Sequence, residues 1–173
     1  MSEDPPREID GFVEREHPRL VGALGLYTGD RLLAEELAQE ALARACRDWE
    51  RIAVMRAPGA YVHRIAVNLA NSWFRRARAR RRALERLGDP ADRGDEDPSP
   101  ADAVAVRAAV AELTPKRRTA IVLCFFLGYS TGEAADVMGV EPPTVRSLLH
   151  RAKEDLAATL DDDADATETI RHG

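Results

Sequence analysis

The sequence has few residues of the kinds that form disulfide frameworks, metal centres or membrane spans. Its two cysteines, Cys46 and Cys124, are too few for a framework, and none of its cysteine and histidine pairs has the spacing of zinc ligands. Both cysteines lie in apolar helical contexts and are expected to be buried. No apolar run approaches the ~18 residues of a membrane span, and the acidic start is not a signal peptide. We therefore expect a cytoplasmic chain with no metal, cofactor or membrane partner.

Catalytic patterns are missing as well. The sequence has no glycine-rich phosphate loop, no nucleophile next to a base and no carboxylate pair in an apolar context, so no enzyme activity is expected. Aromatic residues make up 5% and alternating strand patterns are nearly absent, whereas hydrophobic residues make up 45%. The abundant residues are helix formers. We predict an all-α fold in which 173 residues form two small domains.

Charge is sorted along the chain. The net charge is −5, yet residues 51–86 hold ten arginines against one acidic residue. Residues 1–50 and the region after residue 86 are acidic overall. A localised positive surface, rather than the bulk charge, indicates nucleic-acid binding.

Helix caps, glycine and proline positions and shifts in composition predict four segments. A first domain covers residues 9–84, with helices over about 9–27 and 31–48 separated by Thr28-Gly29-Asp30, a stop followed by a cap. Pro18 either kinks the first helix or marks a break. An acidic linker rich in proline and glycine spans residues 85–102 and is expected to be flexible. A second domain spans residues 103–160, and an acidic, frayed tail follows over 161–173.

A third helix begins near Pro58-Gly59 and has two distinct faces. At 3.6 residues per turn its apolar residues fall within about 100° of one another and can be buried; they are Val62, Ile65, Ala66, Leu69 and Trp73. Polar residues face the other way and can meet a ligand; they are Arg64, Asn68, Asn71 and Arg75. Phe74 is either a packing residue or a stacking surface. The run from Arg75 to Arg82, which includes Arg76, is either a solvated helix end or a phosphate-binding segment.

The second domain has the pattern of a helix-turn-helix. After a helix over 103–113, Thr114-Pro115 starts another helix, whose apolar side includes Ile121, Leu123, Phe125 and Phe126 and which ends at Gly128. Ser130 and Glu133 form a capping box. In residues 131–151, Gly139 lies at the turn and Val145 and Leu148 join the helices. The second helix exposes side chains suited to DNA: Thr144, Arg146, Ser147, His150 and Arg151. The alternative is an ordinary helical hairpin with a basic face.

An acidic patch lies on the same domain as the arginine run. It comprises Glu35, Glu36, Gln39 and Glu40. A solvated helix face is one interpretation. Because DNA repels such a face, a protein-binding surface is the other.

Taken together, three motifs resemble the extracytoplasmic-function sigma factors of bacterial RNA polymerase. They are Thr28-Gly-Asp-Arg-Leu-Leu-Ala-Glu-Glu-Leu-Ala-Gln-Glu-Ala-Leu42, Ala60-Tyr-Val-His-Arg-Ile-Ala-Val-Asn68, and Leu113-Thr-Pro-Lys-Arg-Arg118 with the helix-turn-helix ending Thr144-Val-Arg-Ser-Leu-Leu-His-Arg-Ala152. The resemblance covers about residues 9–82, as region 2, and 105–160, as region 4. It implies promoter-specific initiation of transcription.

The resemblance also implies partners and roles. Glu36, Gln39 and Glu40 would contact the β′ clamp helices of core polymerase, and the β flap is a second polymerase contact. Arg64, Asn68, Asn71, Arg75 and Arg76, with the loop over about 52–57, would read the −10 element, and Asn68 matches a residue of the base pocket. Thr144, Arg146, Ser147, His150 and Arg151 would read the −35 duplex. The resemblance also allows an anti-sigma factor as a further partner.

Two positions depart from the family pattern. Glu36 stands where the family often has Asp, and Glu141-Pro142-Pro143 replaces the usual start of the recognition helix. The second departure bears on −35 preference more than on fold. Two other functions fit the residues without the resemblance: a stand-alone helix-turn-helix regulator, and a helical adaptor with incidental basic charge. Binding to core polymerase separates the sigma factor from both.

Overall fold

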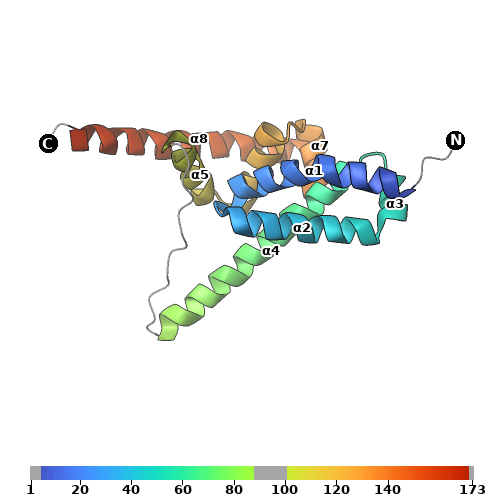
Figure 1. Cartoon of the computed structure of the whole chain (residues 1–173). Coiled ribbons are helices and arrows are strands. Elements are labelled where there is room, and N and C mark those ends of the chain that lie inside the picture. Colours follow the sequence, from blue (N-terminus) through green and yellow to red (C-terminus); the bar gives the residue numbers. More distant parts are fainter. Residues whose placement is uncertain (1–4, 88–100, 172–173) are drawn as a thin grey trace. The chain divides into compact units, whose positions relative to one another are not determined.

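The computed structural model describes residues 5–87 and 101–171, and every regular element in these ranges is helical. The predicted all-α fold is confirmed (Figure 1). No helix in this part of the chain combines the length and apolar character that crossing a bilayer requires. The elements are α1 (Pro5–Thr28), α2 (Arg31–Arg47), α3 (Trp49–Ala53), α4 (Pro58–Leu87), α5 (Ala101–Glu112), α6 (Pro115–Ile121), η1 (Val122–Phe126), α7 (Thr131–Met138) and α8 (Pro142–Arg171).

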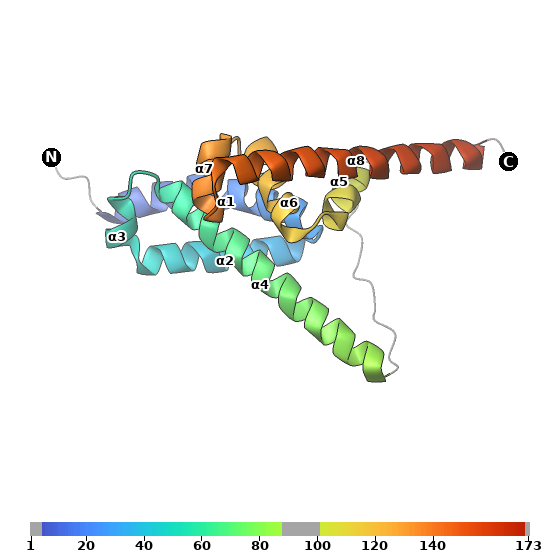
Figure 2. The ribbon, with the colours of Figure 1, turned by 180° about the vertical axis from the view of Figure 1, so that it is seen from behind.

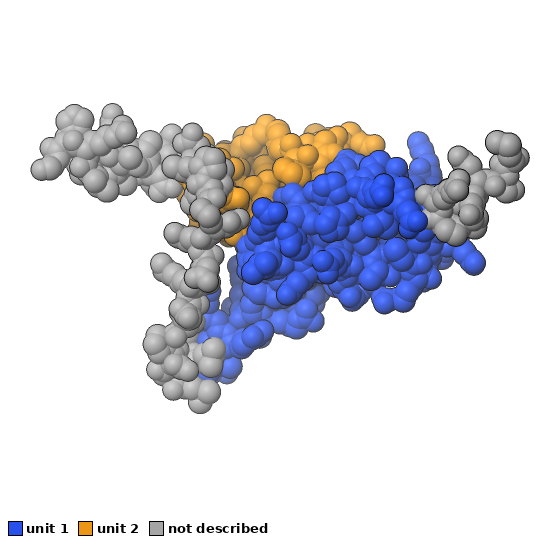
Figure 3. Space-filling view, in the orientation of Figure 1, with its two compact units in different colours: residues 1–24, 30–98 blue, residues 25–29, 99–173 orange. Residues whose placement is uncertain are grey.

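The chain divides into two compact units, shown in different colours in Figure 3. Unit 1 comprises residues 1–24 and 30–98, and unit 2 comprises residues 25–29 and 99–173. The centre of the predicted linker, residues 88–100, lies outside the described residues. Its predicted ends are helical, because α4 continues to Leu87 and α5 begins at Ala101.

Unit 1 is built on close packing between α2 and α4. The face of α2 that is buried carries small side chains, with Ala34, Ala38 and Ala41 all at 0% exposure. On α4, Val62 and Ala66 are buried in turn. Small side chains let two helix backbones approach closely, so this pair sets the orientation of α4.

The predicted stop and cap between the first two helices are confirmed. Gly29 has φ of 74°, a left-handed conformation that glycine adopts at low cost, and ends α1. The Asp30 carboxylate accepts a hydrogen bond from Leu33 N at 3.0 Å and caps α2. Pro18 neither breaks α1 nor ends it, because α1 runs through this exposed position.

Both cysteines depart from the expected burial, and one leucine of α2 faces solvent. Leu32 is 75% exposed, since the buried face of α2 starts at Leu33. Cys46 is exposed on the same helix, and Cys124 is half-buried. The pattern identified the apolar residues correctly but overestimated the width of the buried face.

Unit 2 packs its shorter helices against α8, which contacts α5, α6 and α7. One core cluster joins Leu113, Ile121 and Ala152, with Leu149 and Leu156 packed beside it. Helix α6 begins at Pro115 as predicted, although the Thr114 side chain makes no cap hydrogen bond. Helix α8 continues to Arg171, so the tail expected to fray is helical through that residue.

The segment after α6 is a π-helix rather than a continued α-helix. Leu127 N donates to Val122 O at 3.0 Å, a bond that spans five residues. The wider turn changes the direction of the side chains within it, which include Phe125 and Phe126. Phe125 and Phe126 are therefore 60% and 48% exposed, which corrects their assignment to the buried apolar side.

Arg118 links the end of α5 to α6 inside unit 2. This residue is 4% exposed, and its guanidinium donates to Ala111 O and to Leu113 O, the latter at 3.1 Å. The last carbonyls of a helix lack backbone partners and carry partial negative charge, so a buried cation there satisfies both needs.

We predict that Arg118→Ala lowers the free energy of unfolding by about 3 kcal/mol, because it leaves buried carbonyls without donors. Urea unfolding followed by circular dichroism measures the change. Lys116→Ala, an exposed neighbour, is the control and should have little effect. Equal losses in the two variants would show that Arg118 has no structural role beyond its place on α6.

Candidate nucleic-acid interface

The first half of α4 presents the polar face that the sequence predicts. Arg64 and Asn68 are exposed, as are Arg75 and Arg76, and Asn71 is half-buried. Arg75 also donates a hydrogen bond to the Ser72 hydroxyl at 3.2 Å. Val62 and Ala66 are buried on the opposite side of α4, so this face points away from the core.

The aromatic residues that follow this face are intermediate in burial. Trp73 and Phe74 are both half-buried and meet edge to face, with ring centroids 5.1 Å apart. Trp73, expected in the core, is therefore at its border. Phe74 is a packing residue for Trp73, and part of its ring remains accessible.

A loop over residues 54–57 joins α3 to the start of α4. Val54 is 83% exposed, which is unusual for an aliphatic side chain. Arg51 braces the loop, since its Nη2 donates to the Tyr61 hydroxyl at 2.9 Å and lies 3.2 Å from Asp48 Oδ2. The guanidinium also stacks over the Tyr61 ring, 5.3 Å from its centroid.

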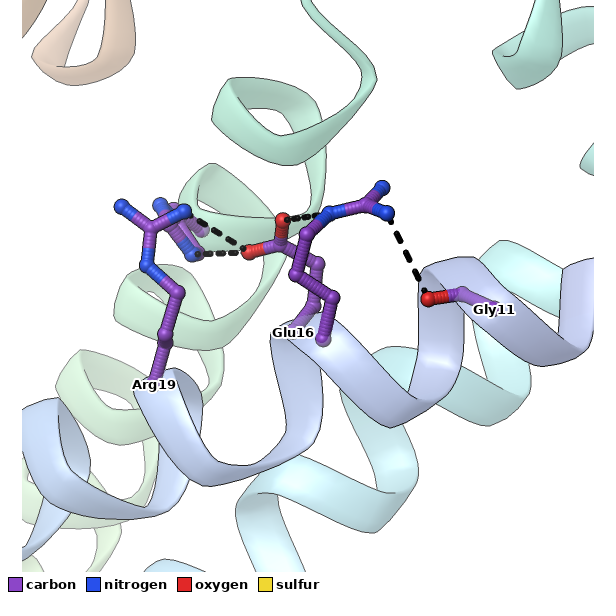
Figure 4. Close-up of polar contacts among 5 residues, drawn as sticks. Gly11, Glu16 and Arg19 are labelled. Carbon is purple, nitrogen blue, oxygen red and sulfur yellow. Dashed lines mark hydrogen bonds and ion pairs between the residues drawn. The ribbon is translucent and has the colours of Figure 1, made fainter.

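A buried polar cluster fastens α1 to α4 (Figure 4). Glu16 and His63 are 3% and 1% exposed, and His63 Nε2 lies 3.2 Å from Glu16 Oε2. Arg15 and Arg19 each place a nitrogen 3.5 Å from a Glu16 oxygen. A Cβ at Gly59 would lie 3.4 Å from Glu16 Oε1, so glycine leaves room for the carboxylate.

Burial holds the pKa of His63 below its ordinary value and outweighs the opposing effect of the Glu16 carboxylate, while Arg19 lowers it further. His63 is therefore neutral near pH 7, and its Nε2 faces Glu16 Oε2. This contact fixes the α4 turn that carries the neighbouring residue, Arg64.

On α2, the acidic residues named from the sequence share one exposed face. Glu36, Gln39 and Glu40 are all exposed. Arg44 Nε donates to Glu40 Oε1 at 2.7 Å and lowers the pKa of the Glu40 carboxyl. Leu32 lies one turn before Glu36, so this face begins with an exposed apolar side chain.

In unit 2, the predicted helix-turn-helix geometry is present. The capping box of Ser130 and Glu133 is complete, and Gly139 has φ of 66° at the turn. Helix α8 starts at Pro142, where a missing N–H costs nothing, and Val145 is fully buried between the two helices.

The outward face of α8 carries the five residues expected to meet DNA. All five are exposed: Thr144, Arg146, Ser147, His150 and Arg151. His150 Nε2 lies 3.7 Å from Glu154 Oε1, a long and exposed contact. Nothing in the described part of unit 2 covers this face, so it has the geometry of a recognition helix.

Comparison with known proteins identifies both units. Residues 12–81 match the family described as Sigma-70 region 2, and residues 103–156 match Sigma-70, region 4. The RNA polymerase sigma-E factor of Streptomyces antibioticus is 37% identical over 172 residues, which cover 97% of this chain and 94% of that protein. The chain belongs to the sigma-70 family of RNA polymerase sigma factors.

Further relatives place this sigma factor in the extracytoplasmic-function group. The RNA polymerase sigma-E factor of Streptomyces coelicolor is 32% identical, covering 93% of this chain and 92% of that one. The ECF RNA polymerase sigma factor SigE of Mycolicibacterium smegmatis is 33% identical, covering 85% and 59%. The match to region 2 decides against a stand-alone helix-turn-helix regulator.

Solved structures show the same fold. The sigma factor RpoE of Bartonella quintana, in complex with the anti-sigma factor NepR, has a TM-score of 0.73 at 22% identity and covers 90% of this chain and 98% of that chain. CnrH in complex with the cytosolic domain of CnrY has a TM-score of 0.66 at 24% identity, covering 91% and 90%. The helical architecture of this sigma factor is therefore that of its family.

Sequence reasoning missed three features around the site. They are the Glu16–His63 contact, the Arg51–Tyr61 brace and the exposed Leu32. An acid on one helix and a histidine on another carry no local signal, because their sequence separation is large. In the part of the sigma factor that the structure describes, no group of three metal-ligating side chains occurs.

The lowered pKa of His63 predicts how the stability of unit 1 depends on pH. The unfolded chain binds a proton at His63 more readily than the folded chain, so the free energy of unfolding falls as pH drops below the ordinary value of 6.5. His63→Gln retains an N–H donor but does not titrate. We expect a smaller loss of stability between pH 7.5 and 5.5 in this variant than in the wild type. Identical pH profiles in urea unfolding would contradict the prediction.

Proposed function

We propose that this sigma factor divides promoter recognition between its units: unit 1 binds the unpaired −10 strand and unit 2 binds the −35 duplex. The proposal rests on the two exposed polar helix faces, one on α4 and one on α8, each opposite a buried side. Run-off transcription with core polymerase tests it. Start sites absent from reactions with core alone are the expected result. Because core polymerase acts in the cytoplasm, we place this sigma factor there as well.

The α4 face is suited to bases rather than to phosphates alone. The Asn68 amide both donates and accepts hydrogen bonds, so it can pair with the exposed edge of an unstacked base. Arg64, one turn away, supplies positive charge and a planar stacking surface. Val54, exposed in the loop that leads into α4, offers an apolar side chain to the same strand. Together these groups provide a place for a base that has left the duplex.

Binding to such a base favours strand opening. Each lost stacking step costs about 1.4 kcal/mol, which interactions made only with the open strand can offset. The sigma factor then contributes recognition and melting, while the polymerase carries out the chemistry.

The α8 face is suited to the major groove of a duplex. Arg146 can bond a guanine edge through two donors, and Ser147 and His150 can reach bases or phosphates. Gly139 sets the angle between α7 and α8 that lets the second helix enter a groove. Pro142 and Pro143 belong to the first turn of α8, so the departure from the family's usual helix start leaves the helix intact.

Core polymerase has two candidate surfaces. The α2 face with Glu36, Gln39 and Glu40 is acidic and suits the β′ clamp helices. In unit 2, an apolar groove of about 300 Å³ suits a helix of the β flap. Its lining includes Val110, Ile121, Phe125, Phe126 and Leu156. An anti-sigma factor would compete for these surfaces, in keeping with the complexes in which the structural relatives were solved.

The proposed division predicts that two alanine substitutions impair different steps. Arg146→Ala should weaken binding to −35 duplex by about 10-fold or more, because one base contact contributes about 1–3 kcal/mol. Asn68→Ala should leave this binding unchanged and lower the yield of open complexes. Fluorescence anisotropy measures the first effect and permanganate footprinting the second. Loss of duplex binding in both variants would contradict the division.

The α2 face predicts a separate effect on polymerase binding. Glu36→Arg combined with Gln39→Ala should raise the Kd for core polymerase at least about 10-fold, because it reverses charge at the centre of the proposed contact. Glu14→Arg, an exposed charge reversal on α1, is the matched control. Titration with labelled core enzyme gives both values. Equal affinities for the two variants would rule out this face as the contact.

A further inference from the structure

A contact between side chains closes the base of the loop over residues 54–57. Arg51 lies on α3, before the loop, and Tyr61 lies ten residues later, in the first turns of α4. Arg51 Nη2 donates to the Tyr61 hydroxyl at 2.9 Å, and the guanidinium lies 5.3 Å from the centroid of the Tyr61 ring. Helix α3 lies beside the start of α4, as both ribbon views show (Figures 1 and 2). The Arg51–Tyr61 brace therefore joins the two helices that flank the loop.

Asp48 holds the Arg51 end of this brace. Its backbone lies at the junction of α2 and α3, where its carbonyl accepts hydrogen bonds from Arg51 N and Ile52 N, both at 3.0 Å. Its carboxylate Oδ2 lies 3.2 Å from Arg51 Nη2. Ile52 is 0% exposed and anchors α3 in the core. The backbone and the guanidinium of Arg51 are thus both fixed where the side chain reaches toward α4.

Tyr61 lies on the outward face of α4 that carries Arg64 and Asn68. At about 100° per residue, Tyr61 and Asn68 differ in direction by about 20°, and Tyr61 and Arg64 by about 60°. Asn68 lies about two turns, or roughly 10 Å, further along the axis. Val62, which follows Tyr61, is fully buried. The brace therefore attaches α3 to the side of α4 that we propose to hold an unpaired base.

The loop between these two anchors directs its side chains away from the core. Val54 is 83% exposed, and two of the other three loop residues are exposed as well. Met55 N donates to Ile52 O at 3.0 Å, which ties the start of the loop to α3. A short loop held at both ends has few conformations, and release of one end restores many. The direction of the loop relative to the outward face of α4 then depends on the contact between Arg51 and Tyr61.

The surroundings of Arg51 suit a link within the protein better than a contact with phosphate. The Asp48 carboxylate lies beside the guanidinium and compensates its charge. A carboxylate at this position also repels the phosphates of a nucleic acid. One nitrogen of the planar group, Nη2, is directed at Asp48 and Tyr61 together. Arg51 is therefore placed to orient other groups.

We propose that Arg51 is a positioning residue for base selection in the unpaired −10 strand. This inference rests on the proposed function of the α4 face. Through Tyr61, Arg51 sets how the loop over residues 54–57 meets a base that is held at Asn68. It thereby sets how strongly the sigma factor prefers one base over the other three, while Arg51 itself contacts neither base nor phosphate.

The test measures base preference in holoenzyme assembled from core polymerase and the full chain. Fork DNA from a promoter mapped by run-off transcription carries an unpaired −10 strand, in which each position is replaced in turn by each of the four bases. Competition binding gives the ratio of affinities at each position, and this ratio does not depend on the fraction of chain that is folded. Arg51→Ala and Tyr61→Phe each remove one side of the hydrogen bond. Arg47→Ala, which removes an exposed charge one turn earlier, is the matched control.

We expect Arg51→Ala to reduce the strongest base preference at least about 3-fold, because an exposed cation stacked on an aromatic ring shifts an equilibrium by a factor of this size. Tyr61→Phe should reduce it less, since the ring remains under the guanidinium. Arg51→Ala/Tyr61→Phe should lose no more than Arg51→Ala, because both changes act on one contact. Arg47→Ala should keep the wild-type preference. The dependence of affinity on salt should be the same in Arg51→Ala as in the wild type.

Three results would overturn the inference. The first is an unchanged base preference in Arg51→Ala. The second is a slope of log K against log salt concentration that falls by about 0.7 while the preference stays intact, which would mean that Arg51 contacts a phosphate. The third is an equal loss in Arg51→Ala and Arg47→Ala, which would mean an effect of charge alone. If wild-type holoenzyme shows no base preference at any unpaired position, the proposed function fails instead, and this result differs from the other three.

Discussion

The close contact between α2 and α4 is the constraint on which the rest of unit 1 depends. Ala34, Ala38 and Ala41 are fully buried on α2, and Val62 and Ala66 are buried on α4. Because a helix has one phase, burying this side of α4 leaves a single direction for the opposite side. The polar face of α4 with Arg64 and Asn68 points outward for that reason, and any larger side chain at the contact would shift α4 and every group on it.

Charge in unit 1 is separated by helix as well as by sequence. Exposed acids lie on α1 and α2, whereas α4 carries arginines along its outer face. The cluster of Glu16 and His63 is the exception, because it places a carboxylate inside the unit. Three nitrogen-bearing side chains surround that carboxylate and compensate for its loss of water. One unit can in this way present an acidic surface to protein and a basic surface to nucleic acid.

Residue type decides what each surface of a sigma factor can do. In the division that we propose, the amides on α4 distinguish bases and the mixed face of α8 enters a groove. The apolar groove in unit 2 arises differently, since the π-helical turn at Val122–Phe126 exposes two phenylalanines. Irregular helical turns of this kind are frequent at functional sites.

The sequence by itself determined the helical class, the cap at Asp30, the capping box at Ser130, the turn at Gly139 and the two faces of α4. These are local properties, because a cap, a left-handed glycine or a periodic pattern depends on residues a few positions apart. Only the tertiary structure decided that Leu32 and Cys46 are exposed, that Phe125 and Phe126 leave the core, and that Glu16 meets His63. Periodicity gives the phase of a helix but not the width of its buried face, which depends on how far the neighbouring helices extend. A contact between distant residues requires the packed chain to bring them together.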